Sequence, residues 1–406
     1  MKIPNAKYVL LIIFLYLYLY NPIFQIIDFG LIKILLLISI FYIIATKRIK
    51  LFITLFKNEI ILSIILIVYS SLVVFWGDGT AFKVPYNHVV WFLECFTIPF
   101  FILFFFKDIF RNQSWESIVV TTGFIASLIT LFLILNPKIN FIIHDSVIRD
   151  TLINIKDPRT LYRGFAIAES SAYSYGIIQG LLLAICLISI KRNHLYAIPV
   201  IFLFISILFN ARIGFICLII GLSLMLLKRK VKILNTVIFL FIAFVGYILF
   251  FKSNFFIGNS ASLKWGFNFF NDTVKFITGQ ETQVTNYTIL FNRMFFSPEK
   301  FINLLFGEGR IVFYATKGSD VGYINEIFVG GLVYLILLLS FLFYMFVRNI
   351  NNTTNKAFTA LFFLTLLAVN IKGDALFVSN GFFRLISFYY IYCILLKRFD
   401  SNSLVV

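Results

Sequence analysis

Apolar runs of about 17–25 residues, the length that spans a bilayer as a helix, recur from end to end of the chain. This pattern predicts an all-helical, polytopic membrane protein in which residues 1–406 form one integral membrane domain. The first run could be a signal peptide, but no small-residue cleavage site follows it, so we interpret it as a membrane helix. Twelve spans are expected: 8–26, 29–46, 59–76, 89–106, 116–135, 171–190, 195–210, 212–227, 233–251, 322–347, 357–371 and 380–396.

The composition agrees with this pattern. Hydrophobic residues make up 61% of the chain and charged residues only 13%, whereas a soluble domain carries roughly 25% charged residues. The net charge of +17 would suggest nucleic acid in a soluble protein, but in a membrane protein it reflects basic cytoplasmic loops, so no nucleic acid is expected. The four cysteines lie inside apolar runs without a pairing pattern and are interpreted as small core residues.

Basic residues predict the orientation of the spans. They follow every even-numbered span, at Lys47 and Arg48, Lys107 and Arg111, Lys191 and Arg192, Lys228 to Lys232, Arg348 and Lys356, and Lys397 and Arg398. Because cytoplasmic loops collect Lys and Arg, both termini are expected on the cytoplasmic side. An abundance of Ile, Phe, Lys and Asn is typical of an AT-rich genome and points to a bacterial inner membrane. Two long loops, 136–170 and 252–321, then lie on the outer, periplasmic side.

These outer loops carry cations against the usual trend. The first holds Arg149, Lys156, Arg159 and Arg163, and the second holds Lys264, Lys275, Arg293, Lys300, Arg310 and Lys317. Loops of this length usually have a function, and cations in them indicate an anion to bind. The alternative is an ordinary solvated surface.

The second outer loop is expected to fold as a helical lid. Apolar residues from Leu263 to Ile277 recur at helical spacing, which predicts an amphipathic helix lying either on the membrane or on the protein's own surface. Farther on, Ser297 is expected to be a helix N-cap, with Pro298 at the first helical position and Gly307 at the end.

Several polar residues are expected to meet on the outer side. They are Arg163 and Glu169 before span six, Arg212 between spans seven and eight, Arg293 and Arg310 in the lid, and Asp320 and Tyr323 at the mouth of span ten. Arginine holds phosphate oxygens through a planar fork, so these residues predict a site for a lipid-linked phosphate or pyrophosphate. Asp320 or Glu169 could act as a general base. The alternatives are snorkelling or ion pairing for each arginine, and a helix cap for Asp320.

Other polar signals are weak. His88, His144 and His194 are scattered and no Asp-x-Asp pair occurs in an outer loop, so no metal or other cofactor is expected. Lys33 and Glu94 lie inside spans two and four, where each could line a pathway, although Lys33 could also snorkel outward.

The architecture resembles the O-antigen polymerases (the Wzy family), relatives of the O-antigen ligases. ARIGFICLIIGL, with Arg212 and Gly214, is similar to the arginine-glycine turn of that family, and Arg163 and Arg293 match its loop arginines. FGEGRIVFYATKGSDVGYINEIFVGG is similar to its Gly-x-Gly loop, which a polar pair and a glycine-bearing helix follow. Ligases commonly place histidine first in this pair, whereas Asp320 stands here, as in polymerases.

The resemblance implies a GT-C-like fold and an inverting, metal-independent glycosyltransferase. It would join undecaprenyl-pyrophosphate-linked oligosaccharide repeats into a surface polysaccharide, O-antigen or capsule, on the outer face. Arg163, Arg212 and Arg293 would hold the donor pyrophosphate, with Arg310 and Tyr323 also at the substrate and Asp320, Arg212 and Glu169 as catalytic candidates. Membrane lipid and a chain-length regulator are candidate partners.

Two alternative functions remain open. An O-antigen ligase would pass the finished polymer to the lipid A core. A flippase of lipid-linked oligosaccharides would need charged residues within its spans and short outer loops, whereas these spans have few charges and two loops are long.

Overall fold

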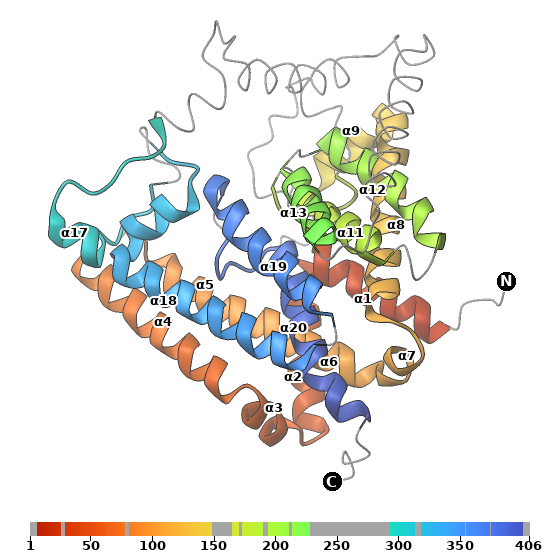
Figure 1. Cartoon of the computed structure of the whole chain (residues 1–406), viewed down its shortest axis with the longest axis horizontal. Helices are drawn as coiled ribbons and strands as arrows, with labels where there is room; N and C mark the ends of the chain where they lie inside the picture. Colours follow the sequence, from red (N-terminus) through yellow and green to blue (C-terminus); the bar gives the residue numbers. More distant parts are fainter. Residues whose placement is uncertain are drawn as a thin grey trace, which may run out of the picture. The chain divides into compact units, whose positions relative to one another are not determined.

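A computed structural model describes residues 6–25, 29–77, 81–147, 165–169, 173–189, 194–210, 213–227, 293–312, 318–353, 355–373 and 375–400. Within these ranges the regular secondary structure is helical, with two isolated β-bridges. The chain divides into two compact units, whose helices are labelled in Figure 1. Unit 1 comprises residues 1–23, 28–122 and 284–406, and unit 2 comprises residues 24–27 and 123–283.

Unit 1 contains most of the described helices. They are α1 (Ala6–Tyr20), α2 (Leu31–Ala45), α3 (Ile49–Leu55), α4 (Lys57–Trp76), α5 (Lys83–Phe92), a π-helical turn (Leu93–Thr97), α6 (Ile98–Phe105), α7 (Lys107–Asn112), α17 (Phe301–Phe306), α18 (Gly322–Asn352), α19 (Lys356–Val369), a 3-10 turn (Asn370–Lys372) and α20 (Gly381–Asp400). Unit 2 contains α9 (Pro137–Ser146), α11 (Ser174–Ser189), a 3-10 turn (His194–Tyr196), α12 (Ala197–Asn210) and α13 (Gly214–Leu227). The helix α8 (Trp115–Leu135) begins in unit 1 and ends in unit 2.

Four described helices are long and apolar enough to cross a membrane. They are α4 (Lys57–Trp76), α8 (Trp115–Leu135), α18 (Gly322–Asn352) and the continuous helix Lys83–Phe105, which combines α5, the π-helical turn and α6. Six shorter apolar helices accompany them. The described part of the chain is therefore all-helical, as predicted, and its apolar helices indicate a membrane-embedded protein. The predicted span 233–251 lies outside the described residues, and span 357–371 overlaps α19, which is not one of these ten helices. Each of the other predicted spans overlaps one of the ten. The total of twelve, the GT-C-like fold and the orientation stay predictions.

Two tryptophans without exposed surface organise the core of unit 1. Trp91 of α5 makes edge contacts with the rings of Phe341 on α18 and Phe383 on α20, with centroids 5.7 and 5.4 Å apart. Trp115 at the start of α8 lies against Tyr389 of α20, with centroids 4.8 Å apart. Each large ring thus fixes helices that are far apart in the sequence.

Small residues bring two helices of unit 2 into close contact. Gly176 and Gly180 lie four residues apart on α11, and their backbones meet that of Gly214 on α13. Such a spacing of small residues lets membrane helices approach closely, which strengthens van der Waals packing where no hydrophobic effect drives association. Nearby, the Tyr175 hydroxyl hydrogen-bonds Ser206 of α12 at 3.1 Å.

Candidate functional site

The long helix α18 is broken near its start, and the segment that follows α17 occupies the break. Gly331 has a non-helical backbone (φ +72°, ψ −173°), so carbonyls of the preceding turn lose their helical donors. The carbonyl of Phe328 accepts instead from the N–H groups of Glu308 (2.8 Å) and Arg310 (3.4 Å), and that of Val329 accepts from Gly309 (3.2 Å). The break is therefore satisfied by backbone that is distant in the sequence.

The same segment also contacts the turn between α4 and α5. The Ala81 N–H donates to the carbonyl of Gly309 at 2.9 Å, and Gly77 lies against the backbone of Glu308. Gly307 and Gly309 have positive φ angles of +84° and +65°, a region that L side chains rarely adopt. A Cβ atom at either residue would meet neighbouring backbone. We call residues 307–310 the glycine wedge.

Three segments of unit 1 meet at the start of α18. The Ser319 hydroxyl donates to the carbonyl of Met294 at 2.7 Å, and the Ser319 N–H donates to Val312 at 3.3 Å. A buried cluster lies beneath them, made by Val312, Val321, Ile324 and Phe328. We call residues 293–296, 308–312 and 318–328 together the α18 mouth.

The α18 mouth contains four of the predicted site residues. Arg293 is exposed and Asp320 is partly exposed, and the Ser319–Met294 hydrogen bond joins the residues next to them. Within the described part of the chain, neither side chain forms an ion pair or a hydrogen bond. Asp320 does not cap α18, since the N-cap is Val321, whose N–H donates to the Ser319 hydroxyl at 3.1 Å. The structure therefore does not bear out the helix-cap interpretation of Asp320.

Arg310 and Tyr323 are held by specific contacts. The Arg310 guanidinium lies 3.0 Å from a carboxylate oxygen of Glu308 and 5.2 Å from the ring centre of Phe328, and its side chain is 42% exposed. Glu308 and Phe328 thus fix the position of the guanidinium, while the exposed part of the side chain remains accessible to a ligand. The Tyr323 hydroxyl donates to the carbonyl of Leu367 in α19 at 2.8 Å, so it ties α18 to α19.

The remaining predicted residues lie outside the described part of unit 1. Glu169 belongs to unit 2 and is partly buried. Arg163 and Arg212 lie outside the described residues, as does the expected amphipathic helix at 263–277.

The predicted start of the lid helix is wrong. The helix α17 begins at Phe301 with Lys300 as its N-cap, not at Ser297 and Pro298. The chain before it passes over α18, where Phe296 lies 5.3 Å from the Phe328 ring, and this packing takes precedence over the capping signal. The predicted end at Gly307 is confirmed.

A second polar cluster lies within the membrane helices of unit 1. Glu94, 1% exposed, sits in the π-helical turn, and its carboxylate lies 2.6 Å from the Lys33 ammonium and 3.4 Å from the Arg384 guanidinium. The Ser379 hydroxyl also donates to it. Buried charges need partners, and π-helical turns often occur at functional sites. The sequence analysis identified Lys33 and Glu94 as separate intramembrane charges, but it did not identify Arg384. The available signal was that Arg384 is an arginine near the start of the last predicted span.

A third charged group ties three helices together. The Glu59 carboxylate at the start of α4 pairs with Arg348 near the end of α18 and accepts a hydrogen bond from the Tyr390 hydroxyl of α20. In the sequence analysis, Arg348 was interpreted only as one of the basic residues that place a loop on the cytoplasmic side.

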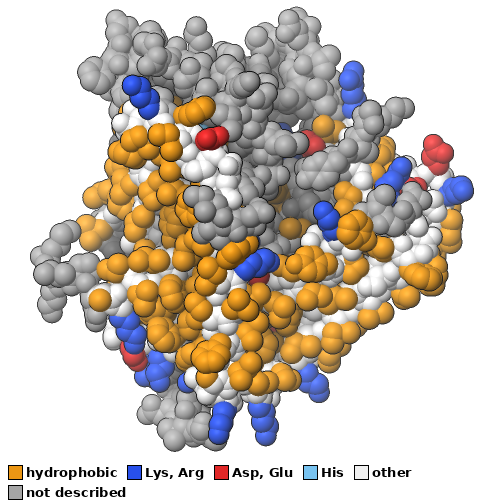
Figure 2. Space-filling model, turned by 180° about the vertical axis from the view of Figure 1, so that it is seen from behind, with side chains coloured by type: hydrophobic (Ala, Val, Ile, Leu, Met, Phe, Trp, Pro, Cys, Tyr) orange, Lys and Arg blue, Asp and Glu red, His pale blue; other side chains and the backbone are white. Residues whose placement is uncertain are grey.

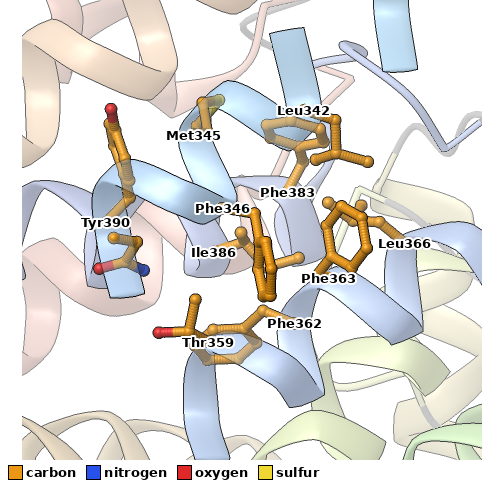
Figure 3. A pocket seen from close by; sticks show the side chains of 11 residues that line it. Leu342, Met345, Phe346, Thr359, Phe362, Phe363, Leu366, Phe383, Ile386 and Tyr390 are labelled. Carbon is orange, nitrogen blue, oxygen red and sulfur yellow. The ribbon is translucent and has the colours of Figure 1, made fainter. Parts of the chain in front are cut away.

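An apolar cavity lies beside this third group, between α18, α19 and α20 (Figure 3). The cavity itself is small, about 30 Å³. Its lining is mostly aromatic and aliphatic, with the polar groups of Asn349, Thr359 and Tyr390. It lies along the second half of α18, so it does not include the α18 mouth.

The described residues contain no group of three His, Cys, Asp or Glu side chains that could hold a metal ion. No protein-family model, curated protein or solved structure matches the chain.

Proposed function

We propose that this membrane protein polymerises undecaprenyl-pyrophosphate-linked oligosaccharide repeats into a surface polysaccharide by inverting glycosyl transfer. The observation that carries the proposal is the α18 mouth. There an accessible carboxylate that does not cap its helix, Asp320, stands at the end of a membrane helix beside segments that carry Arg293 and Arg310. A lipid-linked anionic donor would present its headgroup at such a place.

The chemistry follows from these residue types. The terminal sugar hydroxyl of an incoming repeat attacks the anomeric carbon of the donor, and Asp320 accepts the hydroxyl proton. The bond between the anomeric carbon and the pyrophosphate oxygen breaks, and the negative charge on the leaving pyrophosphate is stabilised by Arg293 and Arg310. Arg163, Arg212 and Glu169 belong to the same proposal through the family resemblance.

The site is tested by replacing the carboxylate without changing its size. Asp320→Asn should reduce polymer formation by about 100- to 10,000-fold, the range that general base catalysis contributes, while the protein stays in the membrane. Asp108→Asn is the matched control, because Asp108 is an exposed carboxylate elsewhere in unit 1 that pairs with Lys7. Normal polymer from the Asp320 variant would remove this residue from the mechanism.

A transporter of lipid-linked oligosaccharides is the second candidate, and the Glu94 cluster favours it. The sequence suggested membrane spans with few charges, which argued against transport, yet the structure pairs buried Glu94 with Lys33 and Arg384 inside helices. Intramembrane charges commonly mark ion or substrate pathways.

Deletion of the gene separates the candidates. Loss of the long polysaccharide ladder with a single repeat left on the core supports the polymerase. Polymer that accumulates on the lipid carrier indicates a ligase, and repeats stranded on the inner leaflet indicate a transporter. An unchanged ladder would contradict all three.

A further inference from the structure

The short helix α17 has an apolar surface that the rest of the chain leaves exposed. Its sequence is FINLLF, and none of its six residues is buried. Phe301 is 73% exposed and Ile302 57%, and Phe306 at its end is also exposed. Exposed apolar surface costs about 25 cal/mol per Å² in water, so this helix is expected to have an apolar environment.

This surface continues onto the ends of two membrane helices. The glycine wedge joins α17 to the turn between α4 and α5, and Figure 1 shows α17 beside the end of α4. That end carries Phe75 and Trp76, and the start of α5 carries Phe82 and Tyr86, all of them exposed. Aromatic residues at the ends of membrane helices typically lie at the level of the lipid headgroups.

Cations border this aromatic surface. Lys300 is exposed directly before α17, and the Lys83 ammonium lies 5.8 Å from the centre of the Phe82 ring. Lysines beside an apolar surface suit the phosphate groups of a bilayer, with their stems in the apolar region and their charges at the headgroups. In Figure 2, hydrophobic side chains cover most of the described face and most Lys and Arg side chains lie toward its margins.

We propose that α17, together with the exposed aromatic residues at the ends of α4 and α5, is a membrane-docking surface that inserts into the interfacial region of the lipid bilayer. The partner is the lipid leaflet and not another protein, because the surface is continuous with the exposed side chains of a membrane-spanning helix, such as Val68 and Leu72 of α4. The glycine wedge joins α17 to α18 through backbone hydrogen bonds to Phe328 and Val329, so docking would hold the α18 mouth near the membrane surface. This inference does not depend on the proposed transferase activity.

Site-directed spin labelling tests the proposal on the full chain. The four native cysteines are buried, so a nitroxide can be directed to an introduced cysteine. Ile302→Cys and Phe301→Cys probe α17, Val68→Cys is the lipid-facing reference, and Glu299→Cys, an exposed polar position next to the helix, is the matched control. Each variant is reconstituted in vesicles of phosphatidylethanolamine with a minority of phosphatidylglycerol.

Power saturation with oxygen and with a water-soluble nickel chelate then reports the surroundings of each label. Labels at 301 and 302 are expected to be accessible to oxygen and several-fold less accessible to nickel than the label at 299, as at Val68. Nickel accessibility equal to that at 299 would show that α17 faces water. Low accessibility to both reagents would show that protein covers it, either another chain or a second copy. Each of these two results would overturn the proposal.

Discussion

Glu59 is a residue whose charge is tolerated only because of its neighbours. It has no exposed surface, and its carboxylate lies between the Arg348 guanidinium and the Tyr390 hydroxyl. Removing one partner of a buried pair costs about 3–5 kcal/mol, because an uncompensated charge remains inside. Arg348→Met should therefore lower the thermal stability of the detergent-solubilised protein strongly.

A double variant distinguishes charge burial from lost packing. Glu59→Gln combined with Arg348→Met removes both charges, so it should recover much of the stability that Arg348→Met loses. Lys57→Met removes an exposed cation two residues from Glu59 and should change the melting temperature little. If the double variant is no more stable than Arg348→Met, the ion pair does not explain the effect.

At the residue scale, sequence reasoning found the α18 mouth but not the charged partners. Asp320 and Arg310 were identified because they are polar residues in the segment directly before the apolar run of span ten, which is a local signal. Arg348 on α18 is 289 residues from Glu59 in the sequence, and Arg384 on α20 is 290 residues from Glu94. Only the packing of the helices brings them together, and nothing local in the sequence specifies it.

At the element scale, the break in α18 holds the lid segment in place. Gly331 has positive φ, and an added Cβ would overlap the backbone of Leu305 at the end of α17. Strained backbone of this kind costs of order 1–3 kcal/mol. Gly331→Ala should therefore release the glycine wedge from α18, and trypsin should cleave after Arg310 faster than in the unmodified protein.

The control for this variant is Ile336→Ala on the same helix. Ile336 is 61% exposed and the wedge is bound through Phe328 and Val329, so truncation of Ile336 should leave the rate of cleavage after Arg310 unchanged. Unchanged cleavage in Gly331→Ala would mean that the break in α18 does not hold the lid.

The packing of α11 on α13 in unit 2 depends on glycine in a similar way. A Cβ atom at Gly180 would overlap the Gly214 backbone, so Gly180→Ala should force the helices apart and cost about 1–3 kcal/mol, as overpacking of a core does. Thermal unfolding of the variant measures this loss. Ile219→Ala on the exposed face of α13 is the matched control, and an equal effect of both would argue against close packing.

Helices were easier to predict than their irregularities. Hydrophobic length located α4 and α8 closely, because the bilayer itself sets the length of a span. The same rule could not locate the break at Gly331 or the π-helical turn at Glu94, since both depend on backbone and side chains that approach from other helices. Glycine pairs such as Gly330–Gly331 indicate where a helix can break, but not whether it does.

At the scale of the whole molecule, the orientation in the membrane decides whether the proposed reaction is feasible. The glycine wedge contacts Phe328 and Val329 of α18 and also Gly77 and Ala81 on either side of the α4–α5 connection, so these parts of unit 1 are expected on the same side of a bilayer. The distribution of Lys and Arg predicts that this side is the outer one. A reporter in the turn 77–82 therefore also reports the side that the α18 mouth faces.

Reporter fusions test this directly. Alkaline phosphatase, which is active only outside the cytoplasm, should be active when fused after residue 80 and inactive when fused after Asn112, where α7 ends. A fluorescent protein at the C-terminus should fluoresce, because that end is expected in the cytoplasm. An inactive fusion after residue 80 would place Asp320 and Arg310 on the cytoplasmic face. Polymerisation on the outer surface would then be excluded even if the α18 mouth proved catalytic.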